Sequence, residues 1–210
     1  MNAADIRNSE WDEFKAQYVH GPSGQTTVTY VFRRRAGETE FRPWVVLGPS
    51  ALLHRIGKSG LGLYAARSFT RGDYIGHYDG TNLGHFGSRQ EALDSDRAKY
   101  RLRRGNDKLI TVRVSGTSGV DLIDGSTSGP PYISSCNDPR QIGRITANTE
   151  LTEFGYLRVE HARIPAFDLD KSLAQNQQSE LRWNYGGDEA YWNYQDQLGT
   201  SGQHAIVVEE

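Results

Sequence analysis

Short runs of apolar and β-forming residues, separated by glycine-rich or charged turns, dominate the chain. Thr26 to Phe32 and Phe41 to Leu47 flank a charged loop, a pattern that predicts a β-hairpin. Further strands are expected at Ala51 to Ile56, Lys108 to Val114, Val120 to Ile123, Tyr156 to Val159 and Arg163 to Phe167. Because so many short strands follow one another, we predict a mainly β fold built from several small sheets.

Only two stretches have a helical pattern. Near the start of the chain, Trp11, Phe14 and Tyr18 recur at i, i+3 and i+7, which is typical of one face of a short helix. Ser88 is followed three residues later by a glutamate, which fits a capping box at the start of a helix over 88–104. We therefore expect one or two short helices beside the strands.

The most glycine-rich stretch runs from Gly57 to Gly80 and reads GKSGLGLYAARSFTRGDYIGHYDG. Gly60 and Gly62 flank a single leucine, and such glycines let a ligand approach the backbone because no Cβ stands in the way. Apolar runs on either side of Gly72-Asp73 predict a strand, a turn and a second strand. We expect this stretch to be the scaffold of a ligand site.

Composition narrows the class of protein. The 210 residues are 36% hydrophobic and 24% charged, as in soluble globular proteins with a sizeable core. The net charge of −2 neither favours nor excludes nucleic acid. A single cysteine, Cys136, excludes an intramolecular disulfide and a multi-cysteine zinc site, and the six histidines show no ligand spacing, so we expect no metal.

The chain also lacks the usual signals for a membrane or an export pathway. No apolar run approaches the ~20 residues that span a bilayer, and the first residues contain no apolar signal-peptide core. We therefore expect an intracellular protein without a membrane partner, and the sequence does not distinguish nucleus from cytoplasm.

One motif suggests a nucleotide. Gly60-x-Gly62-x-x-Ala65 fits the dinucleotide-binding fingerprint, which requires a helix that starts at the glycine loop. Only nine residues separate Gly62 from Gly72, and no alternation of strands and helices follows. A dinucleotide-dependent oxidoreductase is therefore the less favoured alternative.

Three separated stretches form a second pattern. G-x-G-L-x-A opens the stretch Gly60 to Gly80; L-I-D-G (Leu122 to Gly125), C-N-D-P-R (Cys136 to Arg140) and Asn148 follow; E-L-R-W-N-Y-G (Glu180 to Gly186) ends it. In this order and spacing they resemble the motifs of the SET-domain protein-lysine methyltransferases. The resemblance implies a β-clip or SET-type fold, in which small sheets surround a threaded loop.

The resemblance also implies a site for S-adenosyl-L-methionine on one face of the domain and a lysine channel on the other. Asn137 takes the position of the motif asparagine that holds the cofactor, whereas Asp138 stands where the family most often has histidine. The implied cofactor-binding residues are Lys58, Ser59, Gly60, Leu61, Gly62, Asn137 and Asp138.

Tyr185 falls on the tyrosine of the closing motif, and the resemblance implies that it is the catalytic residue. Trp183 occupies the aromatic position that shapes the channel in the family. The expected channel walls are Tyr78, Tyr132, Trp183, Tyr191 and Trp192. Many relatives close the channel with a cysteine-rich zinc segment, which one cysteine cannot form, so we expect Tyr191 and Trp192 to supply a lid by packing.

The chemistry suits these residue types. A sulfonium methyl group is already an activated electrophile, so the protein has only to hold a neutral amine in line with it. Lysine has an ordinary pKa of ~10.4 and must lose a proton. Burial in an aromatic channel beside a positive sulfur lowers that pKa, and the Tyr185 hydroxyl can orient the amine.

We therefore predict an N-terminal extension over 1–48 with a short helix and a β-hairpin, a SET-type catalytic domain over 49–187, and an acidic tail over 188–210 that partly closes the active site. The predicted function is S-adenosylmethionine-dependent methylation of a lysine in a peptide or histone-like protein substrate, with no direct nucleic-acid partner. A SET-fold module that binds cofactor or peptide without turnover stays open as an alternative.

Overall fold

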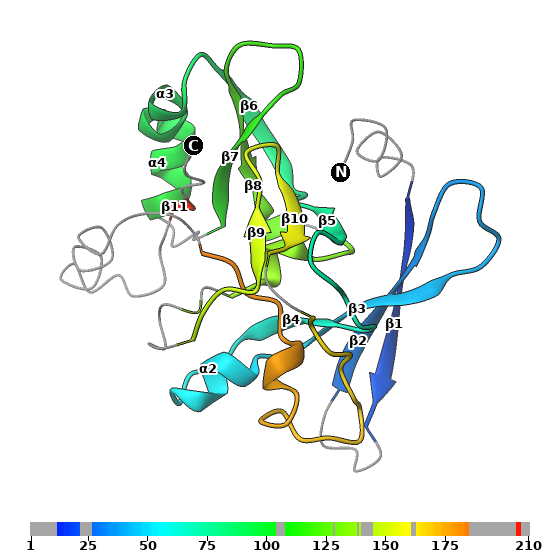
Figure 1. The fold of residues 1–210 in the computed structure, drawn as a ribbon. Helices are drawn as coiled ribbons and strands as arrows, with labels where there is room; N and C mark the ends of the chain where they lie inside the picture. The colour runs from blue at the N-terminus through cyan, green and yellow to red at the C-terminus, as the bar shows by residue number, and fades with distance from the viewer. Residues whose placement is uncertain are drawn as a thin grey trace. The chain divides into compact units, whose positions relative to one another are not determined.

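A computed structural model describes residues 12–21, 27–103, 108–127, 129–137, 139, 145–160, 163–184 and 205–206. Over these ranges the chain is mainly β, with three small sheets and three short α-helices (Figure 1). The predicted fold class is confirmed at this level. None of the described helices has the length and apolar character needed to cross a bilayer.

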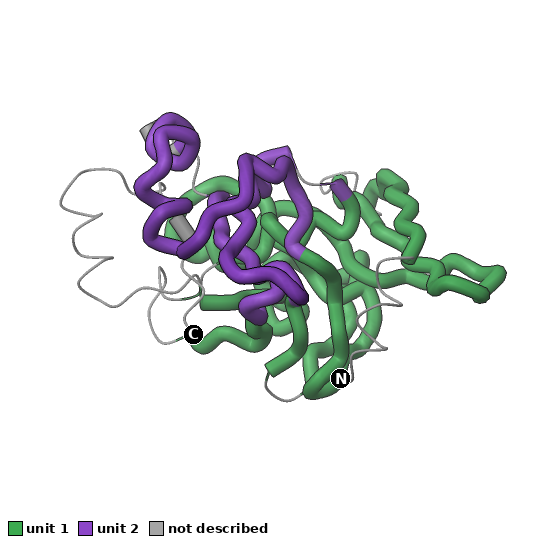
Figure 2. The backbone as a smooth tube through the Cα atoms, turned by 90° about the horizontal axis from the view of Figure 1, so that it is seen from above, with its two compact units in different colours: residues 1–77, 130–150, 157–184 green, residues 78–129, 151–156, 185–210 purple. Residues whose placement is uncertain are grey.

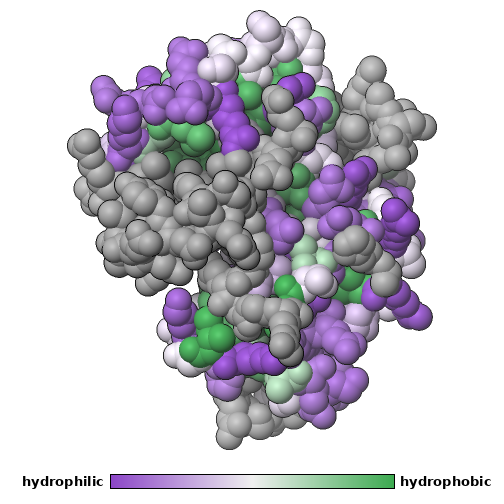
Figure 3. Space-filling model, turned by 60° about the vertical axis from the view of Figure 1, so that its left-hand side comes forward, coloured by the Kyte–Doolittle hydropathy of each residue, from purple (hydrophilic) through white to green (hydrophobic). Residues whose placement is uncertain are grey.

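The chain divides into two compact units (Figure 2). Unit 1 comprises 1–77, 130–150 and 157–184, and unit 2 comprises 78–129, 151–156 and 185–210. On the face drawn in Figure 3, the described hydrophobic residues lie in separate patches among hydrophilic ones.

Unit 1 contains a four-stranded antiparallel sheet in the order β1-β2-β3-β4. Its strands are β1 (Glu13–His20), β2 (Thr27–Arg34), β3 (Arg42–Pro49) and β4 (Leu61–Ala65). The predicted hairpin is confirmed as β2 and β3. Because β3 also pairs with β4, the residues expected as an extension share a sheet with the glycine-rich stretch.

The helix expected near the start of the chain is wrong over Glu13–His20. This segment is β1, which pairs with β2 along its whole length, from Glu13 opposite Arg34 to His20 opposite Thr27. Tyr18 is 77% exposed, so the aromatic spacing does not mark a buried helical face. Backbone pairing to the neighbouring strand outweighs a weak local periodicity here, and Trp11 lies outside the described residues.

The strand expected at 51–56 is also wrong, because this segment forms helix α2 (Ala51–Arg55). The Ser50 hydroxyl caps its start by accepting from the Leu53 amide at 3.1 Å. At its end Gly57 adopts φ +71°, and the amides of Gly57 and Lys58 donate to the carbonyls of His54 and Leu53. This is a Schellman motif, which requires a left-handed residue after the helix.

A second sheet, in the order β5-β10-β9, comprises β5 (Tyr74–His77), β10 (Tyr156–Val159) and β9 (Thr149–Leu151). The predicted strand–turn–strand over the glycine-rich stretch is confirmed as β4 and β5, and the strand at Tyr156–Val159 is confirmed as β10. The strand expected at 163–167 is reduced to one bridge, between Ile164 and Phe69. Short 3-10 helices at Ile133–Ser135 (η2) and Gln177–Ser179 (η4) complete the regular structure described in this unit.

Trp44 is the centre of an aromatic and cationic cluster in unit 1. Its indole nitrogen donates to the Ile75 carbonyl at 2.6 Å. Its ring packs edge-to-face against the Phe69 ring, with 5.0 Å between the two ring centroids. The guanidinium of Arg33 lies 4.3 Å from the Trp44 ring and pairs with Asp12 through its Nε at 2.7 Å. The indole therefore links β3 to β5 while a paired, buried arginine covers one of its faces.

Unit 2 contains the sheet β11-β7-β8-β6. Its elements are β6 (Thr81–Phe86), α3 (Arg89–Asp94), α4 (Asp96–Arg103), β7 (Leu109–Arg113), β8 (Val120–Asp124), the 3-10 helix η1 (Gly125–Thr127) and β11 (Ala205–Ile206). Ala92 and Ala98 from the helices pack with Leu109 and Leu122 from the sheet. The predicted strands at 108–114 and 120–123 are confirmed, whereas β6 was not predicted.

The predicted capping box at Ser88 is confirmed in part. The Ser88 hydroxyl accepts from the Glu91 amide at 3.2 Å, while the Glu91 carboxylate accepts from the Gly87 amide rather than from that of Ser88. The predicted helix divides into α3 and α4, because Ser95 takes an extended conformation between them.

The left-handed position after α2 generates a stability prediction. Gly57→Ala should lower the free energy of unfolding by about 1 kcal/mol, because a Cβ makes φ +71° unfavourable although no described atom lies within 4 Å of it. Urea denaturation measures the difference. The control is Ser59→Ala at an exposed position, expected within about 0.5 kcal/mol of wild type; equal effects for both variants would contradict the assigned helix end.

Candidate functional site

Asn137 connects three parts of unit 1 that lie far apart in the sequence. Its side-chain nitrogen lies 2.9 Å from the Leu61 carbonyl, 3.1 Å from Oε1 of Glu180 and 3.1 Å from the Ser50 hydroxyl. Leu61 begins β4, and Glu180 follows η4. Residues from the three motif segments therefore share one hydrogen-bonded cluster, which we call the Asn137 cluster (Ser50, Leu61, Asn137 and Glu180).

Glu180 is the most deeply buried member of the Asn137 cluster, with 0% of its surface exposed. The Ser50 hydroxyl donates to Oε1 at 2.6 Å, and the Leu52 amide at the start of α2 donates to Oε2 at 3.0 Å. Burial raises the pKa of the Glu180 carboxyl, and these donors, together with Asn137 and the charge of Arg182, oppose the rise. A carboxylate with donors at both oxygens is a rigid anchor.

Tyr64, on β4, makes hydrogen bonds to the backbone at the start of α2, next to the Asn137 cluster. Its hydroxyl accepts from the Ala51 amide at 2.7 Å and donates to the Pro49 carbonyl at 2.6 Å. Burial, and next the charge of Glu180, raise the pKa of the Tyr64 phenol, so this hydroxyl stays neutral. The position of α2 is therefore set by a phenol and a carboxylate together.

The segment around Arg182 is held by backbone and amide hydrogen bonds. On one side, the Leu181 amide donates to the Leu63 carbonyl at 2.7 Å. On the other, the Asn148 side chain donates to the Glu180 carbonyl at 2.9 Å and accepts from the Arg182 amide at 2.8 Å. The Asn148 side-chain amide thus makes the pair of hydrogen bonds that a neighbouring backbone would make. In addition, an isolated β-bridge joins Asn137 to Arg182.

The two glycines of the first motif differ in their surroundings. A Cβ on Gly62 would lie 2.5 Å from Oε1 of Glu180 and 3.1 Å from the Ser50 backbone. A Cβ on Gly60 would meet only the end of the Leu53 side chain, at 2.5 Å, among the described residues. Gly62 is thus required for packing against Glu180, a reason that the spacing of the motif did not indicate.

Lys58, Ser59 and Gly60, ahead of β4, are exposed residues, and the Lys58 amide and the Gly60 carbonyl are hydrogen-bonded to Leu53 and Ser50, respectively. Apolar side chains border this segment, since Leu61 is 54% exposed and Ile56 37% exposed. These are two of the four large hydrophobic residues that are exposed in the described part of the chain. This exposed segment and its apolar neighbours are the part of unit 1 to which the resemblance assigns the cofactor.

The structure also locates three of the expected channel residues. Trp183 is 1% exposed, and Tyr132 is half-buried at φ +60° just before η2. Tyr78 belongs to unit 2, is 1% exposed, and donates from its hydroxyl to the Lys108 carbonyl at 3.0 Å. Asp138, Tyr185, Tyr191 and Trp192 lie outside the described residues.

Sequence reasoning missed Ser50 and Glu180 as members of the site. The closing motif includes Glu180, but the resemblance assigns it no role. The sequence feature that could have indicated a role for Glu180 is its position just ahead of two hydrophobic residues, Leu181 and Trp183, which are both buried. An acid next to core positions has to find donors, but the sequence did not indicate that Ser50 and Asn137 would supply them.

Two further findings bear on the candidate chemistry. Gly62 is followed by the rest of strand β4 and not by the helix that the dinucleotide fingerprint requires, which removes the basis of that alternative. The described residues contain no group of three or more histidine, cysteine, aspartate or glutamate side chains arranged to hold a metal ion.

No protein-family model matches the chain, and no curated protein matches its sequence.

The environments of the two glycines generate a matched pair of variants. Gly62→Ala should cost about 3 kcal/mol, because its Cβ meets a buried carboxylate and a backbone carbon that cannot move freely. Gly60→Ala should cost less than about 1 kcal/mol, because a flexible leucine end can turn away. Chemical denaturation of both proteins provides the measurement, and the reverse order would refute the assigned packing.

The burial of Glu180 generates a pH dependence. The folded-state pKa lies above the ordinary value of 4.5, so the folded protein binds this proton more tightly than the unfolded chain. The resulting stability is present below pH 4.5 and is lost as the pH rises through the raised folded pKa. Wild type should therefore lose free energy of unfolding relative to Glu180→Gln over that range.

Denaturation curves from pH 4 to 8 measure this difference. Glu180→Ala serves as the reference for loss of the anchor and should cost about 3 kcal/mol at pH 4, since three donors lose their acceptor. This cost should fall as the pH rises, because wild type loses stability while the alanine variant does not titrate at this position. A constant difference between wild type and Glu180→Gln would show that the carboxyl does not titrate in this way.

Proposed function

We propose that this protein is a SET-type protein-lysine N-methyltransferase that uses S-adenosyl-L-methionine. The observation that carries the proposal is the meeting of the three motif segments at Asn137, which contacts Leu61 and Glu180 across 76 and 43 residues of sequence. A threaded arrangement is what the motif order implies. Chance matches of three short patterns would have no reason to converge in one hydrogen-bonded cluster.

The described residues fit the proposed cofactor. Lys58, Ser59 and Gly60 are exposed, and the neighbouring Leu61 and Ile56 would offer apolar surface for an adenine ring. The side-chain nitrogen of Asn137 holds the Leu61 carbonyl, so the asparagine would set the shape of this edge. The Asn137 cluster thereby preorganises the backbone on which binding depends.

When bound, S-adenosyl-L-methionine supplies a methyl group on a positive sulfur. The protein's proposed task is to position a neutral lysine amine, which lowers the barrier mainly through orientation. Tyr185 is the proposed group that orients the amine, and Trp183, three residues after Glu180, would form part of the channel wall. The substrate would be a lysine in a peptide or histone-like protein.

A non-catalytic module that binds cofactor or peptide is the second candidate. Two observations favour it over other classes. Asp138 replaces the histidine that the family most often has, and the Asn137 side-chain nitrogen is directed to acceptors within the protein. Either change is compatible with binding that is not followed by methyl transfer.

Incubation with S-adenosyl-L-methionine labelled on its methyl group and a lysine-containing peptide array tests the proposal. We expect label on peptide lysines, and Tyr185→Phe should lower transfer at least about 100-fold, as for loss of a hydrogen bond that acts on the reacting groups. Tyr18→Phe, which removes a hydroxyl from the 77%-exposed residue on β1, is the matched control and should retain activity.

Equilibrium binding of the cofactor distinguishes the candidates. Binding without transfer on any peptide would favour the module, and absence of both would refute the proposal. Full activity of Tyr185→Phe would refute the role of that residue while leaving methyl transfer intact.

A further inference from the structure

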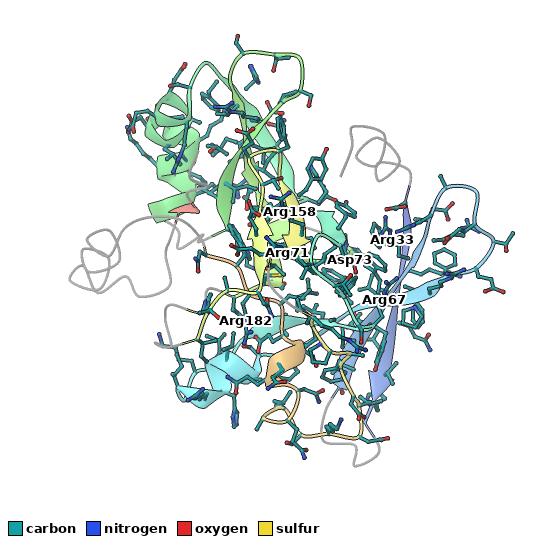
Figure 4. The ribbon with its side chains drawn as sticks, in the orientation of Figure 1. Arg33, Arg67, Arg71, Asp73, Arg158 and Arg182 are labelled. Carbon is teal, nitrogen blue, oxygen red and sulfur yellow. The ribbon has the colours of Figure 1, made fainter. Side chains whose placement is uncertain are left out.

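The connection between β4 and β5, over residues 66–73, gathers exposed positive charge. It carries Arg67 and Arg71, both labelled in Figure 4. Phe69 pairs with Ile164 through backbone hydrogen bonds of 3.0 and 2.9 Å, which brings Arg163 beside Ser68. Two segments about 95 residues apart thus present arginines to one place in unit 1.

Arg67 is held in place by aromatic rings. Its guanidinium carbon lies 5.1 Å from the ring of Trp44 and 5.3 Å from the ring of Phe69. Trp44 is itself fixed by its bond to the Ile75 carbonyl. A guanidinium stacked in this way loses little freedom on binding, and its planar edge stays available to donate hydrogen bonds.

Arg163 approaches the same serine from the other segment. Its Nη2 donates to the Ser68 hydroxyl at 3.0 Å, while Nε of Arg67 donates to the Ser68 carbonyl at 3.4 Å. Two positive groups are therefore held around one residue, although like charges repel. The Ser68 hydroxyl keeps its own hydrogen for a further acceptor.

The charges on this loop are not neutralised within the described part of the chain. There, no carboxylate lies within 4.0 Å of Arg67, Arg71 or Arg163. The Asp73 carboxylate instead closes a turn, accepting from the amide and hydroxyl of Thr70 at 2.9 and 3.2 Å.

Three other arginines of unit 1 differ in this respect. Arg33, Arg34 and Arg158 each pair with an acidic side chain, and for Arg158 the distance to Glu150 is 2.9 Å. Arg35, Arg42 and Arg55 also have no such partner among the described residues, but Arg67 and Arg163 are the two whose side chains both donate to one residue, Ser68. Two unneutralised guanidinium groups held together are suited to an external anion.

We propose that Arg67, Ser68 and Arg163 form a binding site for the phosphate group of a phosphorylated peptide. A phosphate monoester carries about −1.5 to −2 charges and three acceptor oxygens. Two guanidinium forks and a hydroxyl match that charge and that number of acceptors, whereas one fork already satisfies a carboxylate. Arg71 adds a third positive charge on the same loop.

A peptide suits this site better than a nucleic acid. Nucleic-acid binding relies on many phosphate contacts and on long-range attraction, and the chain has a net charge of −2. The arginine group is confined to one loop and the segment beside it. The proposal is independent of methyl transfer, because it concerns different residues and a different ligand.

Fluorescence polarisation with labelled peptide pools tests the site on the full chain. The pools share a degenerate sequence with phosphoserine, serine or glutamate at the centre. We expect the phosphoserine pool to bind at least about tenfold more tightly than the serine pool, the gain expected for charge-assisted hydrogen bonds. Arg163→Gln and Arg67→Lys should each remove most of this gain, the second because lysine lacks the planar fork.

Arg158→Gln is the matched control, since it removes an exposed arginine that already has a carboxylate partner in Glu150. It should change binding less than twofold. Among the described residues, the exposed Arg163 side chain makes its hydrogen bond to Ser68. Arg163→Gln should therefore keep the fold even if a change at Arg67 disturbs Trp44, and thermal unfolding of each variant verifies this.

Four results would overturn the proposal. They are the absence of a difference between the phosphoserine and serine pools, a glutamate pool that binds as tightly as the phosphoserine pool, unchanged binding by Arg163→Gln and Arg67→Lys, and tighter binding of a single-stranded oligonucleotide.

Discussion

The burial of one carboxylate, that of Glu180, constrains much of unit 1. A charge removed from water has to be surrounded by donors, and here they come from a serine hydroxyl, an asparagine side chain and the amide of the second residue of α2. Ser50 serves twice, because the hydroxyl that donates to Glu180 also caps α2. The start of α2, the beginning of β4 and the segment after η4 are thereby fixed relative to one another within this unit.

This anchor gives the proposed cofactor edge a physical basis. The carbonyl of Leu61 accepts from the same asparagine that contacts Glu180, so the backbone ahead of β4 is shaped before any ligand arrives. Gly62 makes room for the carboxylate, and Gly57 ends α2 with a left-handed turn. Gly62, which the motif assigns to ligand approach, thus has a structural role, as does Gly57 just ahead of the motif, whereas Gly60 is an exposed residue.

A second feature of unit 1 is the alternation of guanidinium groups and aromatic rings around Trp44. Arg33 lies against this ring and against Tyr74, at 4.3 and 5.2 Å, and is neutralised by Asp12. Arg67 lies against Trp44 and Phe69 and has no such carboxylate among the described residues. The same type of contact therefore serves packing in one case, and in the other holds an exposed charge at the proposed phosphate site.

The sequence alone determined the mainly β class, the β2–β3 hairpin, β4, β5, β7, β8 and β10, because short β-forming runs between turn residues carry their own local signal. Tertiary structure decided β1 and α2. In β1 the edge of β2 supplied partners that outweighed a weak periodicity, and in α2 a five-residue helix depended on Ser50, Tyr64 and Glu180 rather than on its own propensity. The Asn137 cluster could be named only through motif positions. Its bonds join residues 43 to 130 positions apart, and such contacts arise from chain folding that no local pattern encodes.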